Sequence, residues 1–344
     1  FAVKHYQSHP SLFHLCRGKS PEKHTILSSY PLFIIKVCKN IKKNTEYYAF
    51  PLVLLNKTNK LKLNCLMIIF TRKEELKKHL KSHFLSTNIG FVPTMGALHE
   101  GHISLIKESI KKCEITICSI FINPTQFNGK SDLIKYPKTL KQDIDKLIEY
   151  KCDILYQPEA EDLYTKNETR KSFLLRGIDQ ELEGAFRPNH FNGVATIVEK
   201  LLNIIKPNIS FFGMKDIQQL MVIKELVKSK KINTQIIGLP TVREKNGLAK
   251  SSRNIHLSEK NRKQASLIFK QLTFCKQNIT SDNINITLEK AKEKLIKEKI
   301  KIEYFELINL DSFKSSDKIF TDKKYAICVA VYIAGIRLID NIIL

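Results

Sequence analysis

Between residues 67 and 240, short apolar runs of strand length alternate with helical segments, and no other feature constrains the fold as strongly. Ile115–Ile122 is β-branched and almost wholly apolar, as expected for a strand covered on both faces. Further strands are expected at Ile89–Val92, Cys152–Tyr156, Ile209–Phe212 and Thr234–Ile237. Regular alternation of strand and helix predicts an α/β fold with a doubly wound parallel sheet, of Rossmann-like type.

The intervening helices are expected from apolar residues at helical spacing. In the first of them, Leu76, Leu80 and Phe84 repeat along one face, and Thr71 with Glu74 matches a capping box. The other expected helices are Ile103–Cys113, Thr139–Tyr150, Val194–Ile205 and Ile217–Val227.

The pattern changes after Pro240, where helices are followed by strands. The expected helices are Leu257–Lys276 and Thr287–Lys299, and the expected strands are Phe305–Leu310, Tyr325–Ala334 and Arg337–Ile342. Helices and strands that are segregated along the chain are typical of an α+β unit. We therefore predict one domain over residues 67–240 and a smaller C-terminal α+β domain over residues 241–344.

Residues 1–66 lack the order of the segment that follows. They carry ten lysines and one arginine against two glutamates, a net charge of +9, and show no sustained period. A basic leader poor in acidic residues is typical of a transit peptide, and an upstream stretch carried in by an early start would look similar. Met67 stands directly before the ordered pattern, which favours the second interpretation. In either case we expect residues 1–66 to lie outside the fold.

The whole chain carries a net charge of +23, from 57 lysines and arginines against 34 aspartates and glutamates. Such a charge raises the question of a nucleic-acid or anionic-membrane partner. The excess is mostly Lys scattered through a chain rich in Ile and Asn, which favours a bias of composition over a binding patch. We therefore expect no nucleic-acid partner. No membrane partner is expected either, since no apolar run approaches the ~20 residues that span a bilayer.

The eight cysteines form no Cys-x-x-Cys pair, and none lies near a His at the spacing of zinc ligands. Cys118 and Cys328 lie inside apolar runs, where Cys usually behaves as a small hydrophobic residue. These features predict a reducing compartment without a disulfide framework, and we expect a cytoplasmic protein.

The strongest functional pattern is Pro93–His102, PTMGALHEGH, between the first strand of the alternation and its helix. Ligands bind at the carboxyl ends of the strands in an open parallel sheet. The following helix offers free N–H groups and a positive dipole to a phosphate. His99 and His102 can donate hydrogen bonds to a leaving pyrophosphate, so H-x-G-H here predicts nucleotidyl transfer. Zinc binding is the rival use of this pair, but no third ligand is near in sequence.

Four more polar turns carry groups that suit small anionic or hydroxylated ligands. They are Asn123–Phe127 (NPTQF), Arg187–Gly193 (RPNHFNG), Phe212–Gln219 (FGMKDIQQ) and Gly247–Asn254 (GLAKSSRN). Gln126 can both donate to and accept from a hydroxy acid. Lys215 can neutralise a phosphate, whereas Asp216 can bind ribose hydroxyls or only cap a helix. Arg187 or His190 could meet a carboxylate, and the small hydroxyls beside a cation in the last turn suit a phosphate.

These five stretches, in this order, resemble the pantothenate synthetase (pantoate–β-alanine ligase) family of H-x-G-H nucleotidyltransferases. The resemblance runs from about Met67 to the chain end, where Arg337–Asn341 also looks like the closing strand of that family. It implies an ATP-dependent ligase that joins pantoate to β-alanine through a pantoyl adenylate, with release of pyrophosphate and AMP. It also implies Mg²⁺ carried by ATP, and a homodimer formed through the larger domain.

The resemblance also implies roles for individual residues. Catalytic roles fall to His102, His99 and Lys215, and Asp143 would be a possible outer contact for the metal ion. Pantoate and β-alanine would be bound by Asn123, Gln126, Arg187, His190 and Gln219. ATP would be bound by Pro93, Thr94, Met95, Gly96, His99, Gly101, His102, Gly213, Lys215, Asp216, Val242, Lys250, Ser251, Ser252 and Arg253.

Two residues depart from the pattern of that family. Met214 stands where the family usually has Glu, and Lys250 stands where it usually has Met or Leu. Neither change removes a group that the reaction needs. Three alternatives stay open at this point: another H-x-G-H nucleotidyltransferase, a nucleic-acid-binding protein, and an inactive relative that serves as a binding module.

Overall fold

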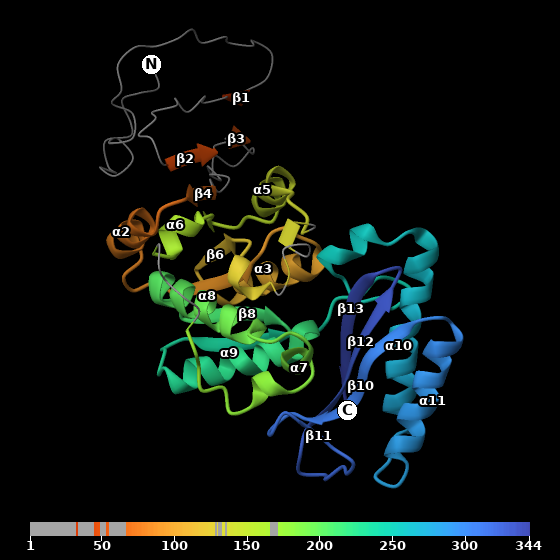
Figure 1. Cartoon of the computed structure of the whole chain (residues 1–344). Coiled ribbons are helices and arrows are strands. Elements are labelled where there is room, and N and C mark those ends of the chain that lie inside the picture. The colour runs from red at the N-terminus through yellow and green to blue at the C-terminus, as the bar shows by residue number, and fades with distance from the viewer. Residues whose placement is uncertain are drawn as a thin grey trace, which may run out of the picture.

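The computed structural model describes residues 67–127, 129, 133–134, 136–165 and 171–344, together with three short upstream strands (Figure 1). These strands are β1 (Leu32–Phe33), β2 (Thr45–Tyr48) and β3 (Val53–Leu54), of which β1 and β3 pair with each other. Among the described residues, no helix is both long and apolar enough to cross a membrane.

The larger sheet has seven strands in the spatial order β2-β4-β7-β6-β5-β8-β9. Every pairing from β4 to β9 is parallel, and β2 adds one antiparallel strand at the edge of β4. The parallel strands are β4 (Met67–Phe70), β5 (Ile89–Thr94), β6 (Ile115–Ile120), β7 (Ile154–Tyr156), β8 (Ile209–Gly213) and β9 (Gln235–Leu239). The predicted parallel α/β sheet is therefore confirmed.

The order of these strands reverses beside β5. The chain passes from β5 to β6 and β7 on one side, and later to β8 and β9 on the other. Such a reversal opens a crevice at the carboxyl ends of the neighbouring strands, which is where ligands bind in open α/β sheets. Pro93–His102 leaves β5 at this point.

Helices cover both faces of the larger sheet. Residues of α2 (Lys73–His83), α8 (His190–Ile205) and α9 (Ile217–Ser229) share one apolar core with it. Residues of α3 (Glu100–Lys112) and α5 (Leu140–Glu149) share a separate core with strand residues such as Val92 and Cys118. Burial on both faces explains why these strands are apolar throughout. Short helices complete this part at Pro124–Gln126, α6 (Ala160–Leu163), Ile178–Gln180, α7 (Glu183–Phe186) and Met214–Asp216.

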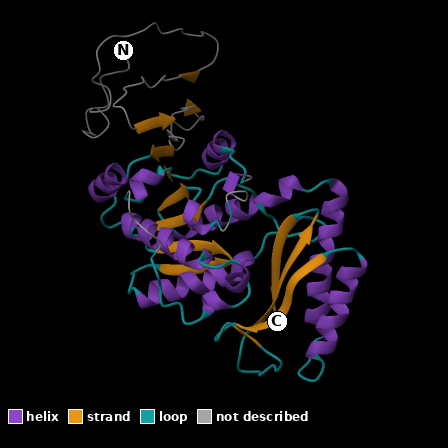
Figure 2. Ribbon diagram, viewed as in Figure 1, coloured by secondary structure: helices purple, strands orange, loops and turns teal. Residues whose placement is uncertain are grey.

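The C-terminal part is a four-stranded antiparallel sheet in the order β11-β10-β12-β13, entered through a short helix at Ser252–His256. Its helices, α10 (Glu259–Asn278) and α11 (Ile284–Lys297), lie on the side of the sheet away from the parallel sheet (Figure 2). Its strands are β10 (Lys301–Asn309), β11 (Lys314–Ser315), β12 (Tyr325–Ile333) and β13 (Ile336–Ile343).

Strand β12 lies between two cores, which explains its unbroken apolar sequence. Ile327, Val329 and Val331 pack against the helices α10 and α11. The alternate residues Ala326, Cys328 and Ala330 belong to the core of the parallel-sheet part. Because side chains alternate across a strand, one face of β12 closes the small unit and the other joins it to the larger one.

Three details differ from the sequence-based expectations. Residues 67–70 form strand β4, which was not predicted, and α2 begins at Lys73. The N-cap of α2 is Arg72 without a side-chain cap, so the predicted capping box from Thr71 to Glu74 is wrong. Residues 45–48 pair with the sheet, although residues 1–66 were expected to lie outside the fold. The rest of the upstream segment lies outside the described residues, and the domain boundary at residue 241 stays a prediction.

The cysteines of the described segments are all buried free thiols: Cys113, Cys118, Cys152, Cys275 and Cys328. Burial raises the pKa of Cys118 and of Cys328, as expected for thiols that fill apolar space. Cys16, Cys38 and Cys65 lie outside the described residues.

Candidate active site

A cleft lies at the carboxyl ends of β5, β6 and β8, where the strand order reverses. Part of its wall comes from residues 240–242 and 250–253, which follow the last strand of the larger sheet. The predicted site residues that line it are Pro93, Thr94, Met95, His99, Gly101, His102, Asn123, Gln126, Gly213, Lys215, Asp216, Gln219, Val242, Lys250, Ser251, Ser252 and Arg253.

Pro93–His102, here called the histidine turn, is held in place by the buried carboxylate of Asp143. The two oxygens of Asp143 accept hydrogen bonds from the backbone N–H of Ala97 (2.9 Å) and of Leu98 (2.7 Å). Gly96, with φ of 79°, lies against this carboxylate, and a Cβ there would come within 3.1 Å of it. Asp143 therefore fixes the backbone of the turn. Gly96 allows the turn to adopt its shape, but it does not line the cleft.

His99 and His102 form a capping box at the start of α3. His99 Nδ1 accepts from the backbone N–H of Gly101 (3.1 Å), and His102 Nδ1 accepts from the backbone N–H of His99 (3.3 Å). The two rings lie 4.1 Å apart between centroids. Because each Nδ1 accepts a hydrogen bond, the neutral ring carries its proton on Nε2. Two N–H donors are thus available from this turn.

Both imidazoles are neutral near neutral pH. Burial, together with the positive charges of Lys215, Lys250 and Lys146, lowers the pKa of His99 to about 4. Burial, followed by the effect of His99, lowers the pKa of His102 to about 3. The site is therefore suited to donating hydrogen bonds to an anion while gaining no proton itself.

Gln126 and Asn123 form the side wall beside the histidine turn. Asn123 Nδ2 donates to Gln126 Oε1 (3.1 Å) and to the carbonyl of Gly193 (3.2 Å) on α8. A Cβ on Gly193 would lie 2.4 Å from the carbonyl oxygen of Thr125, so this close approach of helix and turn requires glycine. The NPTQF turn is thereby held against α8.

Lys215 and Asp216 follow β8 and face the cleft from the opposite side. The Lys215 ammonium lies 3.6 Å from Asp216 Oδ1. Asn341 of β13 donates to the carbonyl oxygens of Met214 (2.9 Å) and of Lys215 (2.7 Å). The C-terminal sheet therefore helps to position the cation predicted to bind phosphate.

Residues 250–253, here called the serine turn, meet the histidine turn directly. The hydroxyl of Ser252 donates to the carbonyl of Ala97 (3.1 Å). The Lys250 ammonium lies 3.1 Å from Glu100 Oε2, on the first residue of α3. Ser251 accepts from the backbone N–H of Arg253 (3.3 Å), which orders the turn itself.

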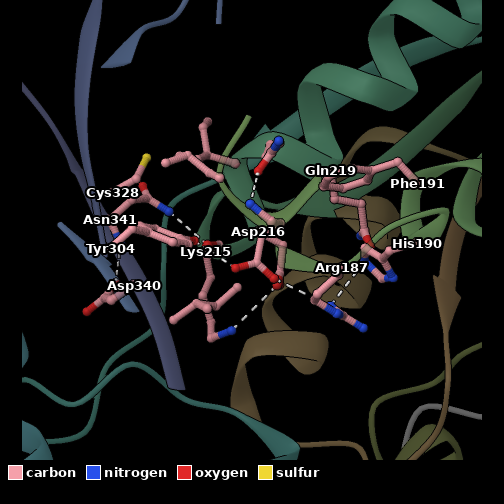
Figure 3. A pocket seen from close by; sticks show the side chains of 15 residues that line it. Arg187, His190, Phe191, Lys215, Asp216, Gln219, Tyr304, Cys328, Asp340 and Asn341 are labelled. Carbon is pink, nitrogen blue, oxygen red and sulfur yellow. Dashed lines mark hydrogen bonds and ion pairs between the residues drawn. The ribbon is translucent and has the colours of Figure 1, made fainter. Parts of the chain in front are cut away.

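A second, smaller cavity lies between the parallel-sheet part and the C-terminal sheet. Lys215, Asp216 and Gln219 line both this cavity and the cleft. Figure 3 shows Arg187 and His190 on one side of it, with Tyr304 and Asn341 on the other. The predicted residues Arg187 and His190 therefore lie beside the cleft and not in its wall.

Arg187 and His190 both form hydrogen bonds with the backbone carbonyl of Gln126. The carbonyl of Gln126 accepts from His190 Nδ1 (2.7 Å) and from Arg187 (3.4 Å). Burial and the charge of Arg187 lower the pKa of His190 to about 4, so its ring is neutral. Since a carbonyl can only accept, the ring proton is on Nδ1.

Glu183 joins the two parts of the molecule behind these residues. Its carboxylate accepts from Arg337 of β13 (2.6 and 2.8 Å) and from the hydroxyl of Tyr304 (2.7 Å). It also lies 3.4 Å from Arg187. Burial alone would raise the pKa of Glu183, but the hydrogen bonds and charge of Arg337 hold it at about 2.

Some residues that line the cleft were not predicted from the sequence. Tyr136 is an isolated aromatic residue with no pattern around it, so no signal pointed to it. Val194, Ile197, Val198 and Leu201 of α8 line the cleft although an apolar helix face predicts core packing.

The described residues contain no group of three or more His, Cys, Asp or Glu side chains that could hold a metal ion. Both oxygens of Asp143 are taken by backbone N–H groups. The side chains of the cleft thus do not form a cage of their own for Mg²⁺, which usually binds through one or two carboxylates and substrate phosphates.

The sequence model of a family described as pantoate-beta-alanine ligase matches residues 68–343. The pantothenate synthetase of Flavobacterium psychrophilum is 43% identical over 280 residues, which cover 80% of this chain and 99% of that protein. The pantothenate synthetase of Azobacteroides pseudotrichonymphae is 45% identical over 270 residues, covering 76% of this chain and 94% of that protein.

Two solved structures share the fold. The pantothenate synthetase of Thermus thermophilus superposes with a TM-score of 0.72 at 31% identity, covering 80% of this chain and 98% of that one. The pantoate-beta-alanine ligase of Francisella tularensis, described as a complex with beta-gamma ATP and beta-alanine, gives a TM-score of 0.69 at 40% identity. It covers 80% of this chain and 97% of that one.

Proposed function

The chain belongs to the pantoate–β-alanine ligase family, and on that premise we propose how its residues carry out the reaction. The enzyme joins pantoate to β-alanine by an amide bond at the expense of ATP. A pantoyl adenylate is the proposed intermediate. Pantoate oxygen attacks the α-phosphorus as pyrophosphate leaves, and the amine of β-alanine then attacks the acyl carbon as AMP leaves.

We place ATP between the histidine turn and the serine turn. One observation carries this proposal: His99 and His102 both line the cleft together with Lys215 and Arg253, and each ring accepts a backbone hydrogen bond at Nδ1, which leaves Nε2 to carry the proton. Preformed donors stabilise charge as it develops on the pyrophosphate, because they need no reorganisation. Lys215 adds a cation on the opposite wall. His102, His99 and Lys215 are thus the proposed catalytic residues.

The remaining walls of the cleft have the groups for the nucleotide and for pantoate. Gly213 and Asp216 on one side and Val242, Ser251 and Ser252 on the other would hold the adenosine and phosphates. The amide groups of Asn123, Gln126 and Gln219 can donate and accept, which suits the hydroxyls and carboxylate of pantoate. Positioning two substrates in this way lowers the entropic cost of their reaction.

The carboxylate of β-alanine is assigned to Arg187. This guanidinium borders the second cavity, which shares Gln219 and Lys215 with the cleft. A small zwitterion held there would have its amine toward the acyl group. His190 is assigned an indirect role, since it holds the backbone of Gln126.

The remaining assignments follow from the resemblance of the sequence. Mg²⁺ enters with ATP and is held chiefly by its phosphates, as is usual for this ion. A homodimer formed through the larger domain, a cytoplasmic location and the absence of a nucleic-acid partner complete the proposal.

The test is an assay of the full chain with ATP, Mg²⁺, pantoate and β-alanine, in which pantothenate and AMP are measured. Both products are expected, and omission of pantoate or β-alanine should abolish AMP release in steady state. Exchange of labelled pyrophosphate into ATP, dependent on pantoate alone, is expected for the adenylate. No AMP and no pantothenate with all substrates present would refute the function.

A further inference from the structure

Lys250, which lines the cleft, forms an ion pair with Glu100, the first residue of α3. We propose that Glu100 competes with the phosphates of ATP for the ammonium group of Lys250, so that this pair sets the affinity for polyphosphate. The inference rests on the proposed function, because it takes the cleft to hold ATP. It concerns this chain in particular, since Lys250 stands where the family pattern leads us to expect Met or Leu.

The two residues come from the two turns that meet beside the cleft, and of the two only Lys250 lines it. Glu100 is the first residue of α3 and follows His99, whereas Lys250 opens the serine turn. The distance from Lys250 Nζ to Glu100 Oε2 is 3.1 Å. The stem of Lys250 passes over Gly101, where an added Cβ would lie 4.0 Å from Lys250 Cβ. The ammonium group is therefore held above the histidine turn.

The charge of Lys250 acts inside the site as well as on Glu100. It is one of the cations that lower the pKa of His99, together with Lys215 and Lys146. Lys250 also lines the cleft. A phosphate bound near His99 would therefore meet Lys250 without any change in the fold.

The ion pair between Glu100 and Lys250 can be broken at little cost in free energy. Its side chain is 67% exposed, against 27% for Lys250, so water can solvate the carboxylate once it is released. Ion pairs at such exposure are weak. A polyphosphate carries more negative charge and more acceptor oxygens than one carboxylate, so it can displace Glu100. The bound phosphate then gains the cation that Glu100 releases.

The competition makes opposite predictions for the two partners. Glu100→Gln frees Lys250 and should tighten the binding of inorganic tripolyphosphate about threefold, the scale of a lost exposed ion pair. Lys250→Met removes the phosphate ligand and should weaken the same binding about tenfold. Both variants remove the same pair, so their small effects on thermal stability should be alike.

The measurement is calorimetric titration of the full chain with tripolyphosphate, and then with ATP, at fixed ionic strength. The matched control is Lys112→Met, which breaks another ion pair of α3 (3.4 Å to Glu108) far from the cleft and should leave both affinities unchanged. The double variant Glu100→Gln with Lys250→Met should bind as weakly as Lys250→Met alone, because Glu100 acts only through Lys250.

Two outcomes would overturn the inference. One is a change of the same sign in both single variants, or no change in either. The other is a double variant that gains as much from Glu100→Gln as the unsubstituted protein does, because Glu100 would then repel phosphate directly. Tripolyphosphate binding needs neither pantoate nor β-alanine, so this result stands apart from the ligase assay. A chain that lacks ligase activity but shows the opposite shifts would refute the proposed function alone.

Discussion

The histidine turn and the serine turn face the same cleft, yet they are held in different ways. The histidine turn is fixed by its own helix cap and by the buried carboxylate of Asp143. The serine turn is ordered by backbone hydrogen bonds of its own segment, from Lys250 to Val242 (2.9 Å) and from Asn254 to Ser251 (3.0 Å). It meets the histidine turn through side-chain contacts, from Ser252 to Ala97 and from Lys250 to Glu100. One wall of the cleft is therefore anchored by a buried carboxylate, whereas the other contributes side chains that reach across to it.

This difference bears on how free energy is distributed in the site. A preorganised donor stabilises a transition state without further ordering, so its loss should reduce the rate strongly. A contact that only joins the serine turn to the histidine turn should affect substrate affinity more than the rate of reaction. Substitutions in each of the two turns test this difference.

The largest effect is expected from His102→Ala, which removes a donor of the fixed wall. Adenylate formation should fall by about a hundredfold or more, the scale of a lost transition-state donor. The measurement is pantoate-dependent exchange of pyrophosphate into ATP. His83→Ala, at an exposed His, is the control and should keep the full rate. A loss below about threefold would mean that the fixed wall does not carry the chemistry.

The next effect is expected from Asp143→Asn. The new NH₂ group would face one of the two backbone N–H donors that the carboxylate now satisfies. We expect a loss of about 2 kcal/mol in the free energy of unfolding, measured in urea. The KM for ATP should also rise roughly tenfold.

Asp145→Asn is the matched control for that variant, because Asp145 lies exposed on the same helix, α5. It should change neither quantity. Equal effects of the two substitutions would contradict the view that Asp143 holds the histidine turn.

A smaller effect is expected from Ser252→Ala in the serine turn. The lost hydrogen bond to Ala97 should raise the KM for ATP roughly fivefold and leave kcat nearly unchanged. Steady-state kinetics with saturating pantoate and β-alanine separate the two constants. A fall in kcat as large as that of His102→Ala would remove the distinction between the walls.

No effect is expected from pH over most of the usual range. The imidazoles of His99 and His102 gain protons only as the pH falls toward about 4 and about 3. Pyrophosphate exchange should therefore stay level from about pH 8 to about pH 5 and decline on the acid side. An apparent pKa near the ordinary value of 6.5 that disappears in a variant with both histidines replaced would show that the rings are not held neutral, since the titration of pyrophosphate and ATP would remain.

Much of this architecture could be predicted from the sequence. Apolar runs of strand length gave the parallel sheet, because both of its faces are covered and polar residues have no place there. Strand β4 was missed because its four residues, Met67–Phe70, are too short for a period. The motifs at strand ends were also readable, since the carboxyl edge of a parallel sheet gathers them at one place.

The roles of particular side chains were less readable. Asp143 was predicted as a possible outer contact for the metal ion, which stays a prediction, but no sequence pattern indicated that its oxygens accept from the backbone of a turn more than forty residues away. Arg187 and His190 were predicted as substrate ligands, and only the structure showed that both also contact the carbonyl of Gln126. The apolar face of α8 looked like core, and part of it lines the cleft. A residue type states which contacts it can make, while its neighbours decide which ones it makes.

The sequence alone determined the α/β class, the family and the segments that form the cleft, because periodicity and local motifs are properties of neighbouring residues. Only the tertiary structure decided that β12 serves two cores and that Glu183 links both parts through Arg337. It also decided that Lys250 faces Glu100. These contacts join residues far apart along the chain, and the packing of the two units fixes them.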